Sequence, residues 1–205
     1  MLEYISFAPV CGAAKKKVEF MSRSKAPSGT EAKPAKLLVA FEEAEGASAW
    51  QSIGDPIMGG QSEGRVSVSE GDVGEFHGTV RADNGGGFAS VKRDLPAPVN
   101  ASGFEGIEFL ARGNGRTYKV GLRNSTNRNR VVYQQAFTPE PGTWTLVRLS
   151  FRDFVPTWRG RIVSDAAPLD SSRLASLSVF VSGGQYGNFC LRMQSWFLYT
   201  TPAAV

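Results

Sequence analysis

The segment RTYKVGLR, residues 116–123, decides the fold class, because its apolar and polar residues alternate. Tyr118, Val120 and Leu122 fall on one side of an extended chain, and Lys119 and Arg123 fall on the other. Successive side chains of a β-strand point to opposite faces of its sheet. A period of two is therefore typical of a strand with one buried face, and we expect a half-buried strand here.

The same alternation recurs along the chain from residue 37 onward. FEGIEFLAR (104–112), SLSVFVSGG (176–184) and GNFCLRMQ (187–194) each place three apolar side chains on one side, and the second sets them against Ser176 and Ser178. Further candidate strands are 37–41, 64–69, 75–80, 88–93, 131–137 and 143–151. Turn residues separate nearly all of these roughly ten strands, and no amphipathic helix exceeds two turns, so the pattern predicts an all-β sandwich or barrel.

Length and charge limit the classes of function. A chain of 205 residues suits one domain, and no run of apolar residues is long enough for a membrane-spanning helix. The net charge of +4 comes from residues 1–36, which carry seven Lys or Arg and three acids, whereas residues 37–205 carry sixteen of each sign. A neutral body argues against a broad nucleic-acid surface, so we expect no DNA partner.

Residues 1–36 form a basic leader that differs from the rest of the chain. The stretch KKKVEFMSRSKAPSGTEAKPAK (15–36) is small, polar and basic, and such a segment does not fold alone. Its composition is typical of an organelle transit peptide, although Glu3 and Glu19 depart from that pattern. The alternative is an extended tail that docks on a partner. We expect a leader over 1–36, a β-sandwich domain over 37–200 and a short tail over 201–205.

Residues suited to catalysis or metal binding are few. His77 is the single histidine, and the alternation in GEFHGTV (74–80) places it opposite Phe76, toward solvent or a neighbouring strand. A general base needs a nucleophile and an orienting group, and zinc needs a His and Cys set that this chain lacks. Asp55 before Pro56 is typical of a turn but stays open as a calcium ligand. We expect no enzymatic activity and no cofactor.

Two glycine-rich segments, GDPIMGGQSEG (54–64) and NGGGFASVKR (84–93), are candidate contact loops. Gly59, Gly60 and Gly86 have a structural interpretation, because glycine adopts backbone angles closed to other residues at turns. The functional interpretation is a groove floor that a partner backbone approaches closely, with Met58 as an adaptable apolar contact. The two interpretations are compatible.

Two arginine-bearing segments are further candidates for partner binding. VPTWRGR (155–161) is expected to be a loop that carries Trp158, Arg159 and Arg161, residue types that binding hot spots favour. RNSTNRNR (123–130) groups Arg128 and Arg130 behind the strand end. The second segment is a solvated loop or a surface for an acidic partner, and its lack of aromatic residues disfavours single-stranded RNA.

The order of these motifs resembles the complex I intermediate-associated protein 30 family over residues 37–199. Two signatures carry the resemblance in combination: Asp-x-x-Met-Gly-Gly-x-Ser at 55–62 and Asn-Gly-Gly-Gly-Phe-Ala-Ser at 84–90. Supporting motifs are FHG (76–78), ARGNGRTYKVGLR (111–123), YQQAF (133–137), FRDFVPTWRGR (151–161) and GQYGNFCLRM (184–193). The final strand, LRMQSWFLY (191–199), departs from the family by being more aromatic.

The resemblance implies a jelly-roll β-sandwich of the galactose-binding-like kind and a non-catalytic helper role. A mitochondrial member of the family serves assembly of the respiratory NADH dehydrogenase, and related domains occur in plastid proteins tied to photosystem biogenesis. We therefore expect an assembly factor or scaffold whose partners are subunits of a large energy-transducing complex, membrane-peripheral only through those partners. The expected location is an organelle, with the plastid favoured over the mitochondrion.

The alternative function is a carbohydrate-binding module, because such modules share the expected fold. It requires a row of exposed aromatic rings across one sheet face. The nearest candidates in the sequence are Tyr118, Tyr133 and Trp144.

Overall fold

The computed structural model describes residues 35–41, 46–54, 62–69, 71–82, 87–127 and 130–201. The described chain is built from β-strands with two short 3-10 helices between them. The strands are β1 (Lys36–Val39), β2 (Gln51–Gly54), β3 (Glu63–Ser69), β4 (Val73–Val80), β5 (Ala89–Val99), β6 (Gly106–Arg112), β7 (Tyr118–Arg123), β8 (Val132–Phe137), β9 (Thr145–Ser150), β10 (Val155–Trp158), β11 (Arg161–Ile162), β12 (Leu174–Val181), β13 (Gly187–Met193) and β14 (Trp196–Tyr199). The 3-10 helices are η3 (Phe151–Asp153) and η4 (Ser171–Arg173).

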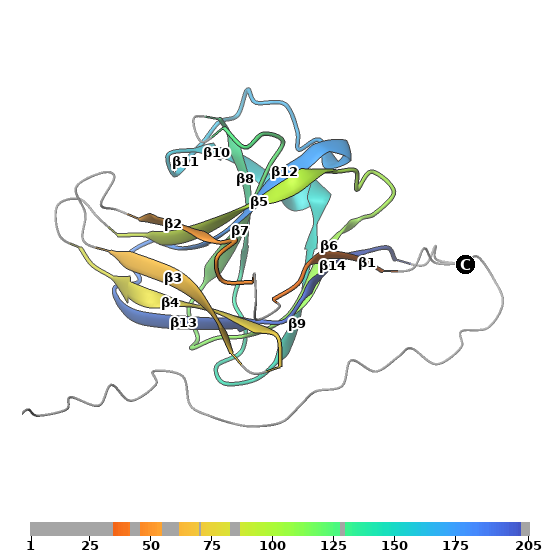
Figure 1. Cartoon of the computed structure of the whole chain (residues 1–205). Helices are drawn as coiled ribbons and strands as arrows, with labels where there is room; N and C mark the ends of the chain where they lie inside the picture. The colour runs from red at the N-terminus through yellow and green to blue at the C-terminus, as the bar shows by residue number, and fades with distance from the viewer. Residues whose placement is uncertain are drawn as a thin grey trace, which may run out of the picture.

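The strands form two seven-stranded sheets that pack face to face (Figure 1). Sheet A has the order β1-β14-β6-β13-β4-β3, with β9 paired to β6, and sheet B has the order β11-β10-β8-β7-β12-β5-β2. All strand pairs within the two sheets are antiparallel. The non-sequential neighbours, such as β12 between β5 and β7, are typical of a jelly roll. The expected all-β sandwich is confirmed.

The alternation predicted from the sequence is confirmed on the core side. Tyr118, Val120 and Leu122 are all fully buried, and each pairs with an apolar residue of β12. The apolar sets of 104–112, 176–184 and 187–194 are buried as well. Burial of this apolar surface is the main favourable term in folding, at about 25 cal/mol per Å².

A chain of aromatic rings crosses the core and joins strands far apart in sequence. Trp196 stacks on Phe109 with ring centroids 4.5 Å apart, and it meets Trp50 edge-on at 6.2 Å. Trp50 stacks in turn on Phe41 at 6.0 Å. Offset and edge-to-face arrangements of this kind add to simple burial. The aromatic character of the last strand therefore serves the packing between β14 and β6.

Apart from the segment 155–161, which is described below, three expectations about the strands are wrong in detail. The final segment forms two strands, β13 and β14, because residues 194 and 195 do not continue the strand. β5 continues to Val99 through two prolines, where its register with β12 shifts. Proline is tolerated there because the ladder is already interrupted. The third error is that β2 was missed, since its four residues show little apolar pattern.

The outer face of sheet B is less exposed than the alternation predicts. Ser176 and Ser178 were expected on the polar side, yet both are fully buried. Lys92 pairs with Ser178 in register and sends its ammonium to the carbonyl of Thr126 in the loop after β7. The loop therefore lies against this face and shields it from solvent.

Candidate functional site

The segment 155–161, expected to be a loop, is instead an antiparallel hairpin of β10 and β11 at one end of sheet B (Figure 1). Trp158 pairs with Arg161, and the two residues between them, Arg159 and Gly160, have φ of 49° and 78°. A two-residue turn with positive φ at both positions matches the twist of the strands that it joins. Positive φ is unusual at arginine, which is why the sequence did not predict a hairpin.

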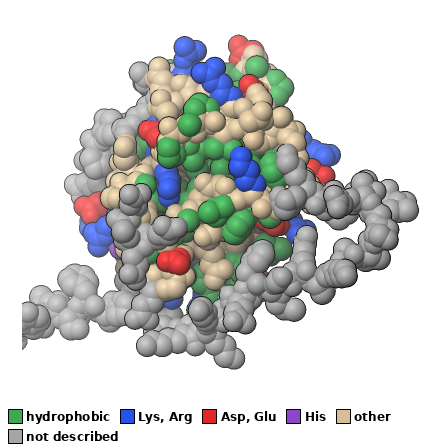
Figure 2. Space-filling model, turned by 45° about the vertical axis from the view of Figure 1, so that its right-hand side comes forward, with side chains coloured by type: hydrophobic (Ala, Val, Ile, Leu, Met, Phe, Trp, Pro, Cys, Tyr) green, Lys and Arg blue, Asp and Glu red, His purple; other side chains and the backbone are tan. Residues whose placement is uncertain are grey.

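The hairpin presents apolar and cationic side chains to solvent. Trp158 is 45% exposed and Ile162 is 71% exposed. The guanidinium of Arg159 lies over the Trp158 ring, 4.6 Å from its centroid. This cation–π contact holds the two side chains together at an exposed site. Figure 2 shows Lys and Arg side chains beside hydrophobic ones at the upper end of the molecule, where β10 and β11 lie in Figure 1.

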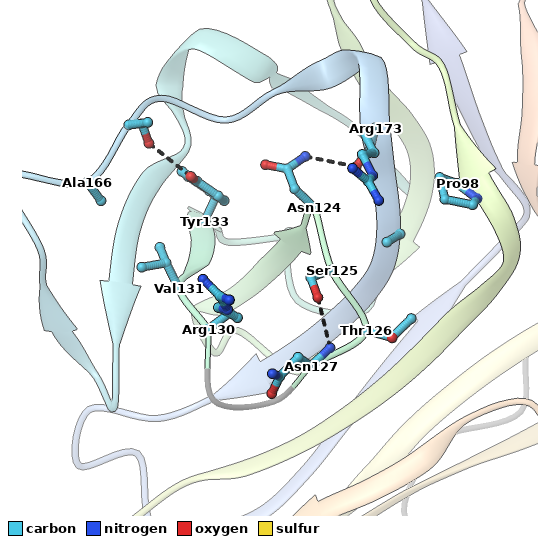
Figure 3. Close-up of a pocket in the computed structure, with 12 residues that line it drawn as sticks. Pro98, Asn124, Ser125, Thr126, Asn127, Arg130, Val131, Tyr133, Ala166 and Arg173 are labelled. Atoms are coloured by element: carbon cyan, nitrogen blue, oxygen red, sulfur yellow. Dashed lines mark hydrogen bonds between the residues drawn. The ribbon is translucent and has the colours of Figure 1, made fainter.

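A groove of about 600 Å³ opens at the same end of sheet B (Figure 3). One wall is formed by residues 124–127, 130 and 131, between β7 and β8, and the other by residues of the segment that joins β11 to β12 through η4. The lining residues are Pro98, Asn124, Ser125, Thr126, Asn127, Arg130, Val131, Tyr133, Ala166, Ala167, Arg173 and Ala175. The groove is within the size range of ligand pockets in proteins.

Hydrogen bonds fix the two walls relative to each other. The Asn124 amide donates from Nδ2 to the carbonyls of Asp170 and Arg173, at 2.5 and 2.9 Å, and its Oδ1 accepts from the backbone N–H of Asp170. The Tyr133 hydroxyl donates to the carbonyl of Ala167 at 2.9 Å. Burial raises the pKa of Tyr133, and the negative charge of Asp170 adds to the shift, so the hydroxyl keeps its proton. The groove is thus preformed.

Lys92, on β5, holds the segment after β7 in place through its side chain. Its side chain is 2% exposed, and its ammonium contacts the Asp94 carboxylate at 2.7 Å and the Thr126 carbonyl at 2.8 Å. A buried charge must be paired and hydrogen-bonded, and this lysine meets both conditions. The Arg123 guanidinium donates to the carbonyl of Arg130 at 2.7 Å and spans the loop at its base.

Positive charge predominates around the groove and the hairpin. The described cationic residues there are Arg123, Arg130, Arg159, Arg161, Arg173 and the buried Lys92, against Asp94, Asp165 and Asp170. The Asp170 carboxylate accepts hydrogen bonds from the Ser172 hydroxyl and backbone N–H, which lower its pKa. That carboxylate is therefore engaged within its own turn, where the neighbouring charge of Arg173 also lowers its pKa.

The structure brings together four of the predicted contact residues. Trp158, Arg159 and Arg161 lie on the hairpin, and Arg130 lines the groove beside it. The other candidates, Met58, Gly59, Gly60, Gly86, Arg128 and the calcium candidate Asp55, lie outside the described residues. Sequence reasoning missed Asn124, Arg173 and Lys92, and it named Tyr133 only as a sugar-binding ring. Their roles depend on contacts between segments more than thirty residues apart or on a short 3-10 helix.

The structure contradicts the prediction that Tyr118, Tyr133 and Trp144 form a row of exposed rings for binding carbohydrate. Tyr118 is fully buried in the core, where its hydroxyl lies 2.9 Å from Asn114 Oδ1 and 3.0 Å from the Cys190 carbonyl and donates its one proton to either acceptor. Tyr133 is 8% exposed, and Trp144 lies partly buried before β9. Tyr118 and Tyr133 face the core because they occupy the apolar positions of the alternation, so neither offers a ring face to a sugar.

His77 lies on the outer face of β4, as predicted, between β3 and β13. Its Nε2 is 3.2 Å from the Ser67 hydroxyl on β3, and it pairs in register with Arg65 and Cys190. Burial lowers its pKa, the charge of Arg65 lowers it further, and Glu75 opposes the shift. Within the described residues, no group of three or more His, Cys, Asp or Glu side chains is placed to hold a metal ion.

We expect His77 to make the protein less stable in mild acid. Because its folded-state pKa lies below the unfolded value of about 6.5, the unfolded chain takes up the proton first, and stability present above that pH is lost as the pH falls. Urea unfolding of wild type and His77→Gln at about pH 7.5 and about pH 5 tests this. The variant should lose less stability than wild type over that interval, and an equal loss would contradict the expectation.

Among the described residues, no helix has the length and apolar character needed to cross a bilayer.

Comparison with known proteins agrees with the fold and the motifs. Residues 39–193 match the complex I intermediate-associated protein 30 family. The mouse protein "Complex I intermediate-associated protein 30, mitochondrial" is 23% identical over 188 residues, which are 82% of this chain and 57% of the mouse protein. An uncharacterized protein of Schizosaccharomyces pombe is 26% identical over 165 residues, covering 71% of this chain and 75% of that protein.

Solved structures of similar fold come from carbohydrate-active proteins. The family 11 carbohydrate-binding module of Clostridium thermocellum cellulase Lic26A-Cel5E has a TM-score of 0.61 at 16% identity, covering 85% of this chain and all of the module. The agarase AgWH50C has a TM-score of 0.60 at 11% identity, covering 84% of this chain and 25% of the agarase. Likeness at such identity establishes the galactose-binding-like sandwich and nothing about ligands. The match over residues 39–193, with the sandwich fold that accompanies it, shows that this chain belongs to the complex I intermediate-associated protein 30 family.

Proposed function

We propose that this protein is a non-catalytic assembly factor or scaffold for a large energy-transducing, membrane-associated complex in an organelle. The observation that carries the proposal is the family match over residues 39–193, together with a mouse relative whose name refers to complex I. The chain spans 57% of that relative's length, so the partners of the whole mouse protein do not transfer automatically. The preformed groove and the exposed hairpin support a binding role.

The chemistry of the described residues supports a role without catalysis. His77 is half-buried beside Ser67 on the outer face of sheet A, whereas the groove lies at the end of sheet B. The polar side chains that line the groove are amides, hydroxyls and arginines, which bind and orient but supply no general base near neutral pH.

Affinity capture tests this proposal directly. A tagged full-length chain is expressed in its own cells, the organelle fraction is solubilised in mild detergent, and captured proteins are identified by mass spectrometry. We expect enrichment of several subunits of one respiratory or photosynthetic complex over an untagged control. Recovery of no such subunit would contradict the proposal.

The leader, residues 1–36, is proposed to direct import, with the β-sandwich over 37–200 as the mature domain. Its basic and serine-bearing composition supports import, and the mouse relative is mitochondrial. We favour the plastid for this chain, as the family also has plastid members. Microscopy of the full chain and of a chain lacking 1–36, both fused to a fluorescent protein, distinguishes plastid, mitochondrion and cytosol. Sequencing the N-terminus of the captured protein shows whether the leader is removed or stays as a docked tail.

A further inference from the structure

The basic groove has two arginines that approach it from opposite walls. Arg130 belongs to the loop before β8, and Arg173 ends η4 before β12 (Figure 3). Both side chains are exposed, and between them lie the amides and hydroxyls of residues 124–127. A planar guanidinium presents paired N–H groups that fit a carboxylate. The two walls can thus hold acidic groups from both sides.

The hairpin continues the same surface. Thr157 pairs with Val132, so Trp158 lies one residue further along, level with Val131, which lines the groove. Trp158 is 45% exposed and shares its face of the hairpin with its pairing partner Arg161, whereas the exposed Val155 and Ile162 lie on the opposite face. Trp and Arg at the centre of such a surface are typical anchors of protein–protein interfaces.

We propose that this groove, together with the β10–β11 hairpin, binds an extended acidic segment of a partner protein. Carboxylates of that segment pair with Arg130 and Arg173, and an apolar residue beside them packs on Trp158. The inference rests on the proposed function and specifies which surface of the protein meets the complex.

Charge and lining favour a peptide over nucleic acid or lipid. Five arginines and Lys92 stand against three aspartates at this end, whereas residues 37–205 as a whole are neutral, so the positive field is local. Nucleic-acid grooves offer open aromatic faces for stacking. Tyr133, the aromatic residue that lines this groove, is buried and bonded to Ala167, and the Trp158 ring on the adjoining hairpin already carries the Arg159 guanidinium over it. A membrane surface would suit a flat basic patch better than walls fixed by Asn124 hydrogen bonds.

Fluorescence anisotropy with labelled probes tests the proposal on the full-length protein. The probes are a short oligoglutamate peptide carrying one leucine and an oligolysine peptide of the same length. The test variant is Arg130→Glu/Arg173→Glu, and the matched control is Arg65→Glu/Arg152→Glu, which reverses two exposed arginines elsewhere on the molecule. We expect the acidic probe alone to bind, the test variant to lose affinity by roughly tenfold or more and the control to change less than about twofold.

Several outcomes would overturn the inference. Equal binding by the test and control variants would show that the groove is not the site. Tighter binding of single-stranded RNA, or of vesicles containing anionic phospholipid, than of oligoglutamate would replace the peptide with that ligand. Circular dichroism and thermal unfolding of both variants establish that they fold, and Arg130→Gln/Arg173→Gln gives a second variant without charge reversal.

Affinity capture separates failure of this inference from failure of the proposed function. If wild type and Arg130→Glu/Arg173→Glu recover the same complex subunits, the protein is an assembly factor that docks through another surface. If wild type recovers none, the proposed function fails, and the anisotropy result alone then decides whether the groove binds acidic peptides.

Discussion

Replacing Trp196 with alanine is expected to lower the free energy of unfolding by about 4 kcal/mol, which is a large part of the stability of an ordinary domain. Trp196 is fully buried, it stacks on Phe109 at 4.5 Å, and it meets Trp50 at 6.2 Å. Removing the indole therefore leaves a cavity between β14, β6 and the segment before β2. The surrounding rings belong to three separate strands or loops and cannot collapse together into the space.

Urea unfolding followed by tryptophan fluorescence and circular dichroism measures this loss. Trp158→Ala is the matched control, because it makes the same chemical change at a site that is 45% exposed, and we expect it to cost less than about 1 kcal/mol. Trp196→Phe keeps a ring and removes an indole N–H that has no hydrogen-bond partner in the described structure, so it should cost less than alanine. Equal losses for Trp196→Ala and Trp158→Ala would contradict the expectation.

The second large effect is expected at Gly78, which follows Phe76 by two residues on β4. Gly78 pairs with Gly64 across β3, and its φ is 159°. A Cβ placed there would lie 2.0 Å from the carbonyl oxygen of Glu63 and 2.9 Å from the Cα of Gly64. Both atoms belong to the backbone of β3, so the clash can be removed only if β3 moves away from β4. We expect Gly78→Ala to cost about 3 kcal/mol.

A second glycine serves as the control that separates the steric clash from the cost of placing alanine at a positive φ. Gly183 has φ of 82°, and a Cβ there would meet nothing within 4 Å. Gly183→Ala should therefore cost only the left-handed penalty of about 1–2 kcal/mol. Chemical denaturation of both variants measures the difference, and a Gly183→Ala loss as large as that of Gly78→Ala would show that close strand contact is not the cause.

Most core strands were predictable because alternation is a local property. The period of two in 116–123 and 104–112 identified the buried faces residue by residue, and the structure confirms both. The strands that were missed or misdrawn lack this local signal. β10 contains Pro156, β11 has two residues, and β14 was merged with β13 because the sequence shows no turn residue stronger than Gln194 and Ser195 between them.

The candidate site was predictable only in part. Trp158 and Arg130 were singled out by residue type, but their distance apart in sequence concealed that β10 and β8 are neighbours. Asn124 and Arg173 carry no local signal, since an asparagine after a strand and an arginine in a short 3-10 helix are typical of solvated turns. Their roles follow from hydrogen bonds between residues 46 and 49 positions apart.

The amino-acid sequence by itself predicted an all-β fold and its apolar faces, placed a neutral body after a basic N-terminal segment and carried the motifs of a protein family. Each of these depends on local periodicity, composition or short motifs, which folding does not alter. The tertiary structure alone decided that Tyr118 and Tyr133 face the core, that Lys92 is buried under a loop, and that a hairpin and two loops enclose one basic groove. Such features arise from long-range strand pairing, and the register of β8 with β10 and of β12 with β7 brings distant side chains into contact.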